Sequence, residues 1–273
     1  MIPEAFVRLA ETLAETARET ARRTSTEPEV EIKADGTPVT ALDRAVEAAL
    51  RRVIERQQPG HGIVGEEFGA EGAGRDWVWV LDPVDGTRQF AAGLPNFGTL
   101  IALCHEGRPV IGVTAHLFYE STCIGVTGRG TLFNRRPVRC AGPERLSRIV
   151  ACISDPDAFD ARTAPGMQAI RTRTRWNVFD GGCLGYASLV RGLVGLCLNG
   201  PNLDPFDIAA LVPVVEAAGG RITDWQGNTL TMESKGEIVA TSGPRLHESA
   251  LEALSGVPQS TRPEGVTSLR HHR

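Results

Sequence analysis

The stretch Trp77–Thr87 (WVWVLDPVDGT) constrains the fold of this chain more than any other. Its first five residues are aromatic, β-branched or Leu, which predicts a strand buried on both faces. The strand runs directly into Asp82 and Asp85, and two close carboxylates beside apolar residues are costly unless a cation neutralises them. Pro83 stiffens the predicted turn, and Gly86 lets the backbone approach a ligand. Hard oxygen ligands beside an open backbone suit Mg²⁺ together with a phosphate group.

The main alternative for this stretch is an Asp-Pro/Asp-Gly turn without a ligand, which is common in loops. Two further motifs argue against it: Gly65–Glu67 shortly before the strand, and Pro205–Asp207 far downstream. Together with D-P-V-D-G-T they resemble the three signatures of the inositol-monophosphatase superfamily, which comprises metal-dependent, lithium-sensitive phosphatases. The resemblance covers nearly the whole chain, from about Glu29 to Leu254.

Length and composition are those of an ordinary soluble globular protein. The chain has 273 residues, 41% of them hydrophobic and 23% charged, and its net charge of -4 gives no reason to expect nucleic acid or an anionic membrane as a partner. The N-terminus lacks a signal-peptide pattern, and no apolar run approaches the roughly 20 residues that span a membrane. The six cysteines are scattered in apolar runs, which predicts free thiols in a reducing cytoplasm.

The order of predicted elements divides the chain into two parts. Residues 1–143 are expected to form an N-terminal α+β domain that carries most of the metal ligands. Apolar residues at helical spacing predict helices over 3–23 and 40–56. Three strand candidates with short turns between them predict a mostly antiparallel sheet: 99–104, 110–115 and 121–126.

In residues 144–257, strands alternate with helices, which predicts a C-terminal α/β domain. One helix is expected over 207–218, stopped by a glycine pair, and this domain would supply Asp207 and the leaving-group pocket. Residues 258–273, which contain Ser, Thr, Pro and basic residues, are expected to be a disordered tail. The resemblance implies one fold class for both parts, an α+β / α/β layered αβαβα sandwich.

The acidic residues of the three motifs are candidate metal ligands. Phosphate monoesters hydrolyse slowly, and Mg²⁺ ions lower the pKa of an attacking water and stabilise the leaving oxygen. The resemblance implies that catalytic Glu66, Asp82 and the carbonyl of Val84 hold one metal, and that Asp82, Asp85 and Asp207 hold another, with two or three ions in total. The alternatives are a solvated loop acid for Glu66 and a helix N-terminal acid for Asp207.

A second group of residues is expected to handle the phosphate and the water. Gly86 and Thr87 are predicted to open a helix whose amides face the phosphate. The resemblance implies that Thr87, together with Asp43, orients and deprotonates the water, because the family pattern K-x-D-G-x-P-V-T-x-x-D occupies residues 33–43. Asp43 has a structural alternative as the last residue of a helix capping box. Asp35 of the same pattern is a further candidate near the metals.

The substrate pocket gives mixed indications. Arg88 after the Thr, and F-G-T-L-I-A-L at 97–103, resemble the histidinol-phosphate phosphatases of the superfamily. Those enzymes typically have an acid that lines the pocket where this chain has Gly182, and Asp180 is the nearest acid here. This departure supports a hypothesis in which the metal chemistry is intact and the leaving-group pocket has changed. The arginine-rich run 171–175 is a candidate for a second anion, although such runs are more often solvated.

The sequence therefore predicts a Mg²⁺-dependent phosphomonoesterase, with histidinol phosphate as the favoured small-molecule substrate. Alternative substrates are inositol-1-phosphate, another cyclitol or sugar phosphate, and a bisphosphate. A non-catalytic binding protein on the same fold is the alternative of a different class. All the metal-site acids are present, which argues against that alternative. The resemblance also implies a homodimer.

Overall fold

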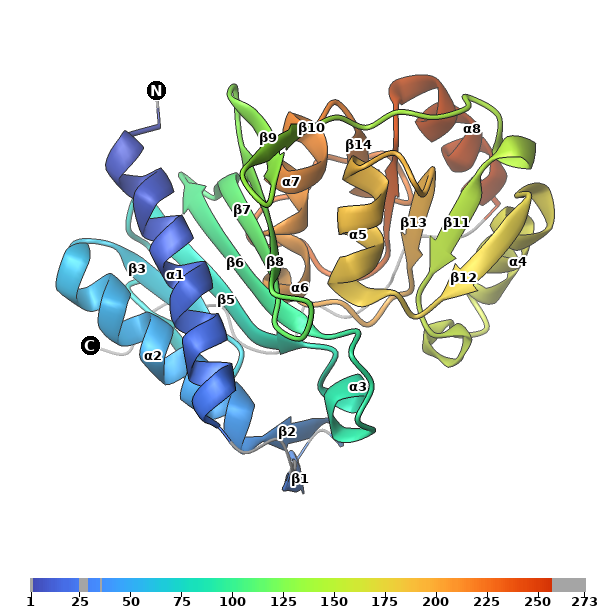
Figure 1. Ribbon diagram of the computed structural model, residues 1–273. Coiled ribbons are helices and arrows are strands. Elements are labelled where there is room, and N and C mark those ends of the chain that lie inside the picture. Colours follow the sequence, from blue (N-terminus) through green and yellow to red (C-terminus); the bar gives the residue numbers. More distant parts are fainter. Residues whose placement is uncertain (1, 25–28, 35, 257–273) are drawn as a thin grey trace.

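The structure of this protein, a computed structural model, describes residues 2–24, 29–34 and 36–256. Five layers, alternately helices and sheets, stack on one another (Figure 1). The fold class predicted from the sequence, a layered αβαβα sandwich, is confirmed. The predicted tail and Asp35 lie outside the described residues.

The first layer consists of two long helices, α1 (Glu4–Arg23) and α2 (Ala41–Gln57). In α1, buried side chains recur every three or four residues at Leu9, Leu13 and Ala17, which is the spacing of a single helix face. This face and the apolar face of α2 share one hydrophobic core with the sheet beneath them. Both helices were predicted from their periodicity.

The second layer is a sheet of eight strands in the order β10-β9-β8-β7-β6-β5-β3-β4. Strands β3 and β5 pair in parallel and the other described pairs are antiparallel, as predicted. A separate hairpin of β1 (Val30–Ile32) and β2 (Pro38–Thr40) precedes α2. The strands of the large sheet are β3 (Gly62–Gly65), β4 (Gly69–Glu71), β5 (Trp77–Asp85), β6 (Gly98–His105), β7 (Arg108–His116), β8 (Ser121–Val126), β9 (Gly130–Phe133) and β10 (Arg136–Val138).

Strand β5 is buried on both faces, because helices cover both sides of the sheet. Trp79 contributes to the core under α1 and α2, whereas Val80 contributes to the core between the two sheets. The strand does not end before Pro83, as the predicted turn would require. It continues to Asp85, with an irregular register between Asp82 and Asp85 where proline cannot donate to the ladder.

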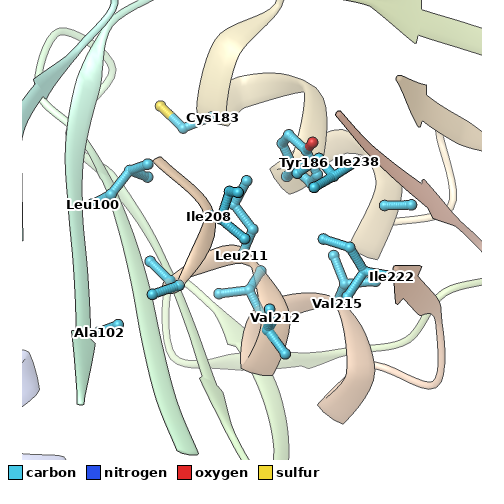
Figure 2. Packing of buried hydrophobic residues seen from close by; sticks show 14 of the residues in the cluster. Leu100, Ala102, Cys183, Tyr186, Ile208, Leu211, Val212, Val215, Ile222 and Ile238 are labelled. Carbon is cyan, nitrogen blue, oxygen red and sulfur yellow. The ribbon is translucent and has the colours of Figure 1, made fainter. Parts of the chain in front are cut away.

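The middle layer contains α5 (Gly182–Val190), α6 (Pro205–Ile208) and α7 (Leu211–Ala217). The single helix expected over 207–218 is therefore two short helices. Pro213 explains the break, since it has no N–H to bond the fourth residue before it and its ring excludes that carbonyl. Apolar side chains of these helices lie between the two sheets (Figure 2).

Two paired glycines bring α7 directly onto the first sheet. Gly112 of β7 is the register partner of Gly125 of β8. A Cβ at Gly112 would lie 2.0 Å from the carbonyl oxygen of Ala210, and one at Gly125 would lie 2.3 Å from that of Pro213. Larger residues at these positions would lift the helix off the sheet, and α6 with it.

The fourth layer is a five-stranded sheet in the order β12-β11-β13-β15-β14, and α4 and α8 form the fifth layer. The short strands β2, β4, β9 and β12 were not predicted. We retain the predicted division of the chain near residue 143 as a proposal, since the chain passes from one sheet to the other between β10 and β11. The remaining elements are β11 (Val150–Ile153), α4 (Ala164–Arg173), β12 (Trp176–Phe179), β13 (Leu196–Asn199), β14 (Arg221–Asp224), β15 (Ile238–Thr241), α8 (Pro244–Leu254), and the 3₁₀ turns Leu146–Arg148 and Pro156–Ala158.

Candidate active site

The end of β5 and the start of the short helix α3 (Thr87–Ala91) form the centre of the candidate site. Asp82 is only 1% exposed, and its Oδ1 accepts a hydrogen bond of 3.0 Å from the Val84 amide. Gly86 has φ +92°, and a Cβ there would lie 3.0 Å from the Asn96 carbonyl oxygen, so the turn into α3 requires glycine. The sequence prediction that a helix opens at this point is confirmed.

Asp43 caps α2 and also contacts Thr87, so the structural alternative holds while its role towards water stays a prediction. Its Oδ2 accepts the Thr40 amide at 2.8 Å and the Thr40 hydroxyl at 2.5 Å, which makes the capping box of α2. Its Oδ1 accepts the hydroxyl of Thr87 at 3.1 Å. The same Thr87 hydroxyl lies 3.0 Å from the Val84 carbonyl oxygen. Capping holds the carboxylate in place, and its second oxygen faces the candidate site.

Glu66 follows β3 and meets a cation that the sequence reading did not single out. The Lys33 ammonium lies 2.9 Å from Glu66 Oε1 and 2.5 Å from Glu67 Oε1. Glu47, fully buried in α2, accepts the Glu67 amide at 2.7 Å and so positions this loop. A buried acid in an amphipathic helix gives no periodic signal, which is why Glu47 was missed, whereas Lys33 stood in the family pattern.

Asp207 lies in the first turn of α6, where the Asp204 amide donates to its Oδ2 at 2.7 Å. The structural alternative, an acid at a helix N-terminus, therefore holds. The short helix also places this carboxylate within electrostatic range of Asp82, Asp85 and Glu66. Asp85 itself accepts the Cys183 amide, at the start of α5, with its Oδ2 at 2.7 Å.

All four acids have a raised pKa, and burial is the largest cause in each. Burial raises the pKa of Asp82 well above its usual range, and the charges of Glu66, Asp207 and Asp85 add to the effect. Burial likewise raises the pKa of Asp207, Asp85 and Glu66, although the Lys33 hydrogen bond opposes this effect at Glu66. A cluster of partly or fully buried acids that repel one another is a site for cations.

The donor set fits a hard divalent cation. Carboxylate and carbonyl oxygens are the ligands that Mg²⁺ prefers, and the Lys33 ammonium already places one positive charge against Glu66. In the described part of the chain, no three His, Cys, Asp or Glu side chains are arranged as a ready-made metal cage. The carboxylates are thus suitable ligands for Mg²⁺ and lie within electrostatic range of one another. Backbone amides and the Lys33 ammonium each bind one oxygen of these carboxylates.

A cavity of about 320 Å³ opens beside these acids. Its wall includes Glu66, Asp85, Asp207, Gly86 and Thr87 from the predicted site, together with all three predicted pocket residues, Arg88, Asp180 and Gly182. Residues of the C-terminal half that the sequence reading did not select complete the wall, among them Cys152, Ser154, Asp155, Tyr186, Cys197, Asn199 and Asn202. Because these residues come from separate strands, loops and helix α5, they carry no local sequence signal for such a wall.

The three predicted pocket residues differ in what they contact. Arg88 is exposed, and its guanidinium lies 3.8 Å from Asp155 Oδ2. Asp180 accepts a hydrogen bond from the Gln89 side chain. Gly182 has φ +47°, and a Cβ there would lie 3.1 Å from Asp85 Oδ2. The arginine-rich run 171–175 lies elsewhere, at the end of α4 and in the loop before β12.

Comparison with known proteins shows which family the chain belongs to. The model of the inositol monophosphatase family matches residues 2–259. The chain belongs to that family. It is accordingly a phosphoric monoester hydrolase, and members of the family generally depend on Mg²⁺. In the part of the chain that the structure describes, no helix has the length and apolar character needed to cross a membrane.

Its relatives include phosphatases with different substrates in their names. The chloroplastic bifunctional phosphatase IMPL2 of Arabidopsis thaliana is 36% identical over 231 residues, which cover 81% of this chain and 66% of that protein. A histidinol-phosphatase of Mycobacterium tuberculosis is 34% identical over 83% of this chain and 88% of its own length. An inositol-1-monophosphatase ImpA of Mycolicibacterium smegmatis is 31% identical over 81% of this chain and 82% of its own length.

Solved structures agree on the fold. An inositol monophosphatase from Zymomonas mobilis superimposes with a TM-score of 0.82 at 36% identity, covering 92% of this chain and 98% of that one. The enzyme from Anabaena gives a TM-score of 0.81 at 28% identity, covering 93% and 96% of the two chains.

Proposed function

We propose that this member of the inositol monophosphatase family hydrolyses L-histidinol phosphate to L-histidinol and phosphate, a reaction of histidine biosynthesis. The observation that carries the proposal is the set of acids that meets the 320 Å³ cavity, with the hydrogen-bonded pair of Thr87 and Asp43 beside it. The histidinol-phosphatase of Mycobacterium tuberculosis, at 34% identity, supports the choice of substrate.

Each half of the site has a chemical task in this proposal. Glu66, Asp82, Asp85, Asp207 and the Val84 carbonyl would hold two or three Mg²⁺ ions, which supply positive charge to the phosphate and lower the pKa of water. The amides at the start of α3 bind phosphate oxygens. The hydroxyl of Thr87 accepts a proton from the attacking water as it passes its own to Asp43, and the capping bonds keep that carboxylate aimed at it.

The far wall of the cavity would receive the leaving group. Histidinol carries an ammonium group, and two carboxylates, Asp155 and Asp180, lie on this wall although Gly182 supplies none. Asp155 Oδ1 accepts the Asp157 amide at 3.0 Å, whereas Oδ2 has a long ion pair with Arg88, at 3.8 Å, so a substrate ammonium can replace that guanidinium at Oδ2. We assign amine recognition to these two acids.

Inositol-1-phosphate is the second candidate substrate. Ser154, Asn199 and Asn202 line the same cavity and offer uncharged hydrogen-bonding groups that suit ring hydroxyls. The relative ImpA, at 31% identity, supports this alternative.

We further propose a cytoplasmic homodimer. All six cysteines are free, which suits a reducing compartment. The edge strand β12 exposes Trp176, Val178 and Phe179, and an unpaired edge with apolar side chains is suited to contact with a second copy. Sedimentation of the purified enzyme measures the assembly directly.

The deciding experiment is a phosphate-release panel with Mg²⁺ that compares histidinol phosphate, inositol-1-phosphate, sugar phosphates and adenosine bisphosphate. We expect the highest kcat/KM for histidinol phosphate. A clear preference for inositol-1-phosphate would overturn the substrate and retain the site. Absence of release from every ester, with Mg²⁺ still bound, would favour a non-catalytic binding protein.

A pair of variants tests the site itself. Asp85→Asn removes a charge next to the cavity and is expected to lower phosphate release by at least about 100-fold, the scale of losing one electrostatic contact to the reacting centre. Asp76→Asn removes the same charge at an exposed residue just before the opposite end of the strand and is expected to leave the rate unchanged. Equal activity of the two variants would show that the acids were assigned wrongly.

A further inference from the structure

Two thiols lie side by side in the wall of the active-site cavity. Cys152 of β11 and Cys197 of β13 are register partners on adjacent parallel strands, so their side chains project from the same face of the sheet. Both line the cavity of about 320 Å³. Adjacent strands are about 4.8 Å apart, which is inside the range of Cα separations that a disulfide spans.

Both sulfur atoms meet α5 at the same point. A Cβ on Gly185 would lie 2.7 Å from Cys152 Sγ and 3.7 Å from Cys197 Sγ. A Cβ on Gly181 would lie 2.6 Å from Cys152 Sγ. The first turn of α5 therefore rests on the thiol pair without intervening side chains, and any change in the size or position of Cys152 Sγ acts on that turn.

That turn supports the candidate metal site. Between the two glycines, the Cys183 amide donates to Asp85 Oδ2 at 2.7 Å, and the Gly182 backbone lies against the same carboxylate. A path of direct contacts thus runs from Cys152 Sγ through the glycine backbone to Asp85.

Cys152 differs from the other five cysteines in its chemistry. The Cys197 thiol, by hydrogen bonding, and the Gly181 amide lower the pKa of Cys152 in spite of burial. Burial raises the pKa of Cys104 and Cys123 to about 12. Burial also raises the pKa of Cys140 to about 11, and that of Cys183 and Cys197 well above the usual range. A thiolate is the reactive form of cysteine, and this contrast favours Cys152 as the nucleophile.

We propose that Cys152 and Cys197 are an oxidisable dithiol, a modification site whose disulfide form inhibits phosphate release. The oxidant is a hydroperoxide. The Cys152 thiolate attacks a peroxide oxygen, the O–O bond breaks, and with one proton the products are a sulfenic acid and water (or an alcohol). Cys197 sulfur then displaces the hydroxyl group, which leaves as water with the Cys197 proton, and the S–S bond forms. Two thiols lose two electrons and the peroxide gains them.

Oxidation reaches catalysis through α5. A disulfide draws the two sulfur atoms together beneath the glycines, and the Cys183 amide moves with the turn. A shift of about 1 Å at a catalytic group lowers a rate on the order of 100-fold, so we expect the disulfide form to release phosphate at least about tenfold more slowly. This consequence rests on the proposed function, whereas the thiol chemistry does not.

The test begins with peptide mapping of the folded wild-type enzyme. Peroxide treatment, alkylation of the remaining thiols and mass spectrometry are expected to reveal a peptide pair that joins Cys152 to Cys197, and a reductant should restore both thiols and activity. Cys197→Ser should stop the reaction at the Cys152 sulfenic acid, which dimedone captures. Cys140→Ser, which alters the half-buried thiol nearest the surface, should oxidise as the wild type does.

Each outcome decides a separate part of the proposal. Oxidation of Cys140 before Cys152, or no joined peptide, would overturn the dithiol site, because exposure alone would then govern reactivity. A joined peptide with unchanged phosphate release would overturn the coupling to Asp85. Peptide mapping of the wild type requires neither the Cys197 variant nor phosphatase activity. The dithiol site can therefore be tested even if that variant does not fold or the proposed function is wrong.

Discussion

Replacing Gly182 with Ala is expected to slow phosphate release while the enzyme remains folded. Gly182 has φ +47°, and an L side chain in this left-handed region costs about 1–2 kcal/mol of folding free energy. The new Cβ would also lie 3.1 Å from Asp85 Oδ2, a contact so tight that the carboxylate must move by a few tenths of an ångström. If about 1 Å of misplacement costs on the order of 100-fold, this displacement lowers kcat by about 4- to 10-fold.

Gly219→Ala provides the matched control. Gly219 has φ +89°, and a Cβ there would have nothing within 4 Å. The two variants therefore share the backbone penalty and differ in the contact with Asp85. Thermal unfolding should show a similar loss of stability in both, and steady-state assays should show a lower kcat only for Gly182→Ala. Full activity of Gly182→Ala, or an equal loss of kcat in both variants, would refute the assignment of Asp85 to the reacting centre.

Two further predictions concern the proton path and acid stability. Thr87→Val removes the hydroxyl that links the site to Asp43 and should lower kcat by about 100- to 10,000-fold. Thr87→Ser keeps the hydroxyl and should retain most activity. Equal rates of the two variants would exclude a role for the hydroxyl. Burial lowers the pKa of His116 and His247 to about 4, so both side chains are uncharged in the folded protein. As pH falls, the histidines of the unfolded chain are protonated before those of the folded protein. The contribution of each uncharged histidine to the free energy of unfolding is complete above pH ~6.5 and is lost as pH falls towards 4. The loss is about 2 kcal/mol for each histidine at pH 5. Urea unfolding of wild type and His116→Gln at pH 7 and pH 5 measures this loss, and a pH dependence that is identical in the variant would contradict it.

Helices and strands whose apolar residues repeat at a regular spacing could be predicted from the sequence. The apolar run of β5 and the face of α1 repeat at the periods of a buried strand and a helix, and both elements were found where they were predicted. The short strands β9 and β12 were missed because each has at most one buried residue, so neither shows the apolar pattern of a buried strand. The break before α7 was missed although Pro213 was visible in the sequence.

The candidate site divides in the same way. Asp82 and Asp85 could be selected as candidates from the sequence alone, because acids at the end of a buried strand have no packing role. Asp207 joined them only through the family resemblance, because its approach to β5 depends on how α6 packs between the sheets. The contacts of Lys33 with Glu66, and of Glu47 with the following loop, arise from side chains that sequence reading treats as solvated.

The structural and the functional interpretations of these acids are complementary. In Asp43, one oxygen caps α2 and the other accepts the Thr87 hydroxyl. In Asp82, Asp85 and Asp207, a backbone amide binds one oxygen of each carboxylate. Such bonds offset part of the cost of burying charge and fix the direction of each carboxylate before any ligand arrives. These hydrogen bonds, which belong to capping boxes at Asp43 and Asp207, therefore orient the carboxylates of the candidate site. An amide side chain at any of these positions would preserve the fold better than the chemistry.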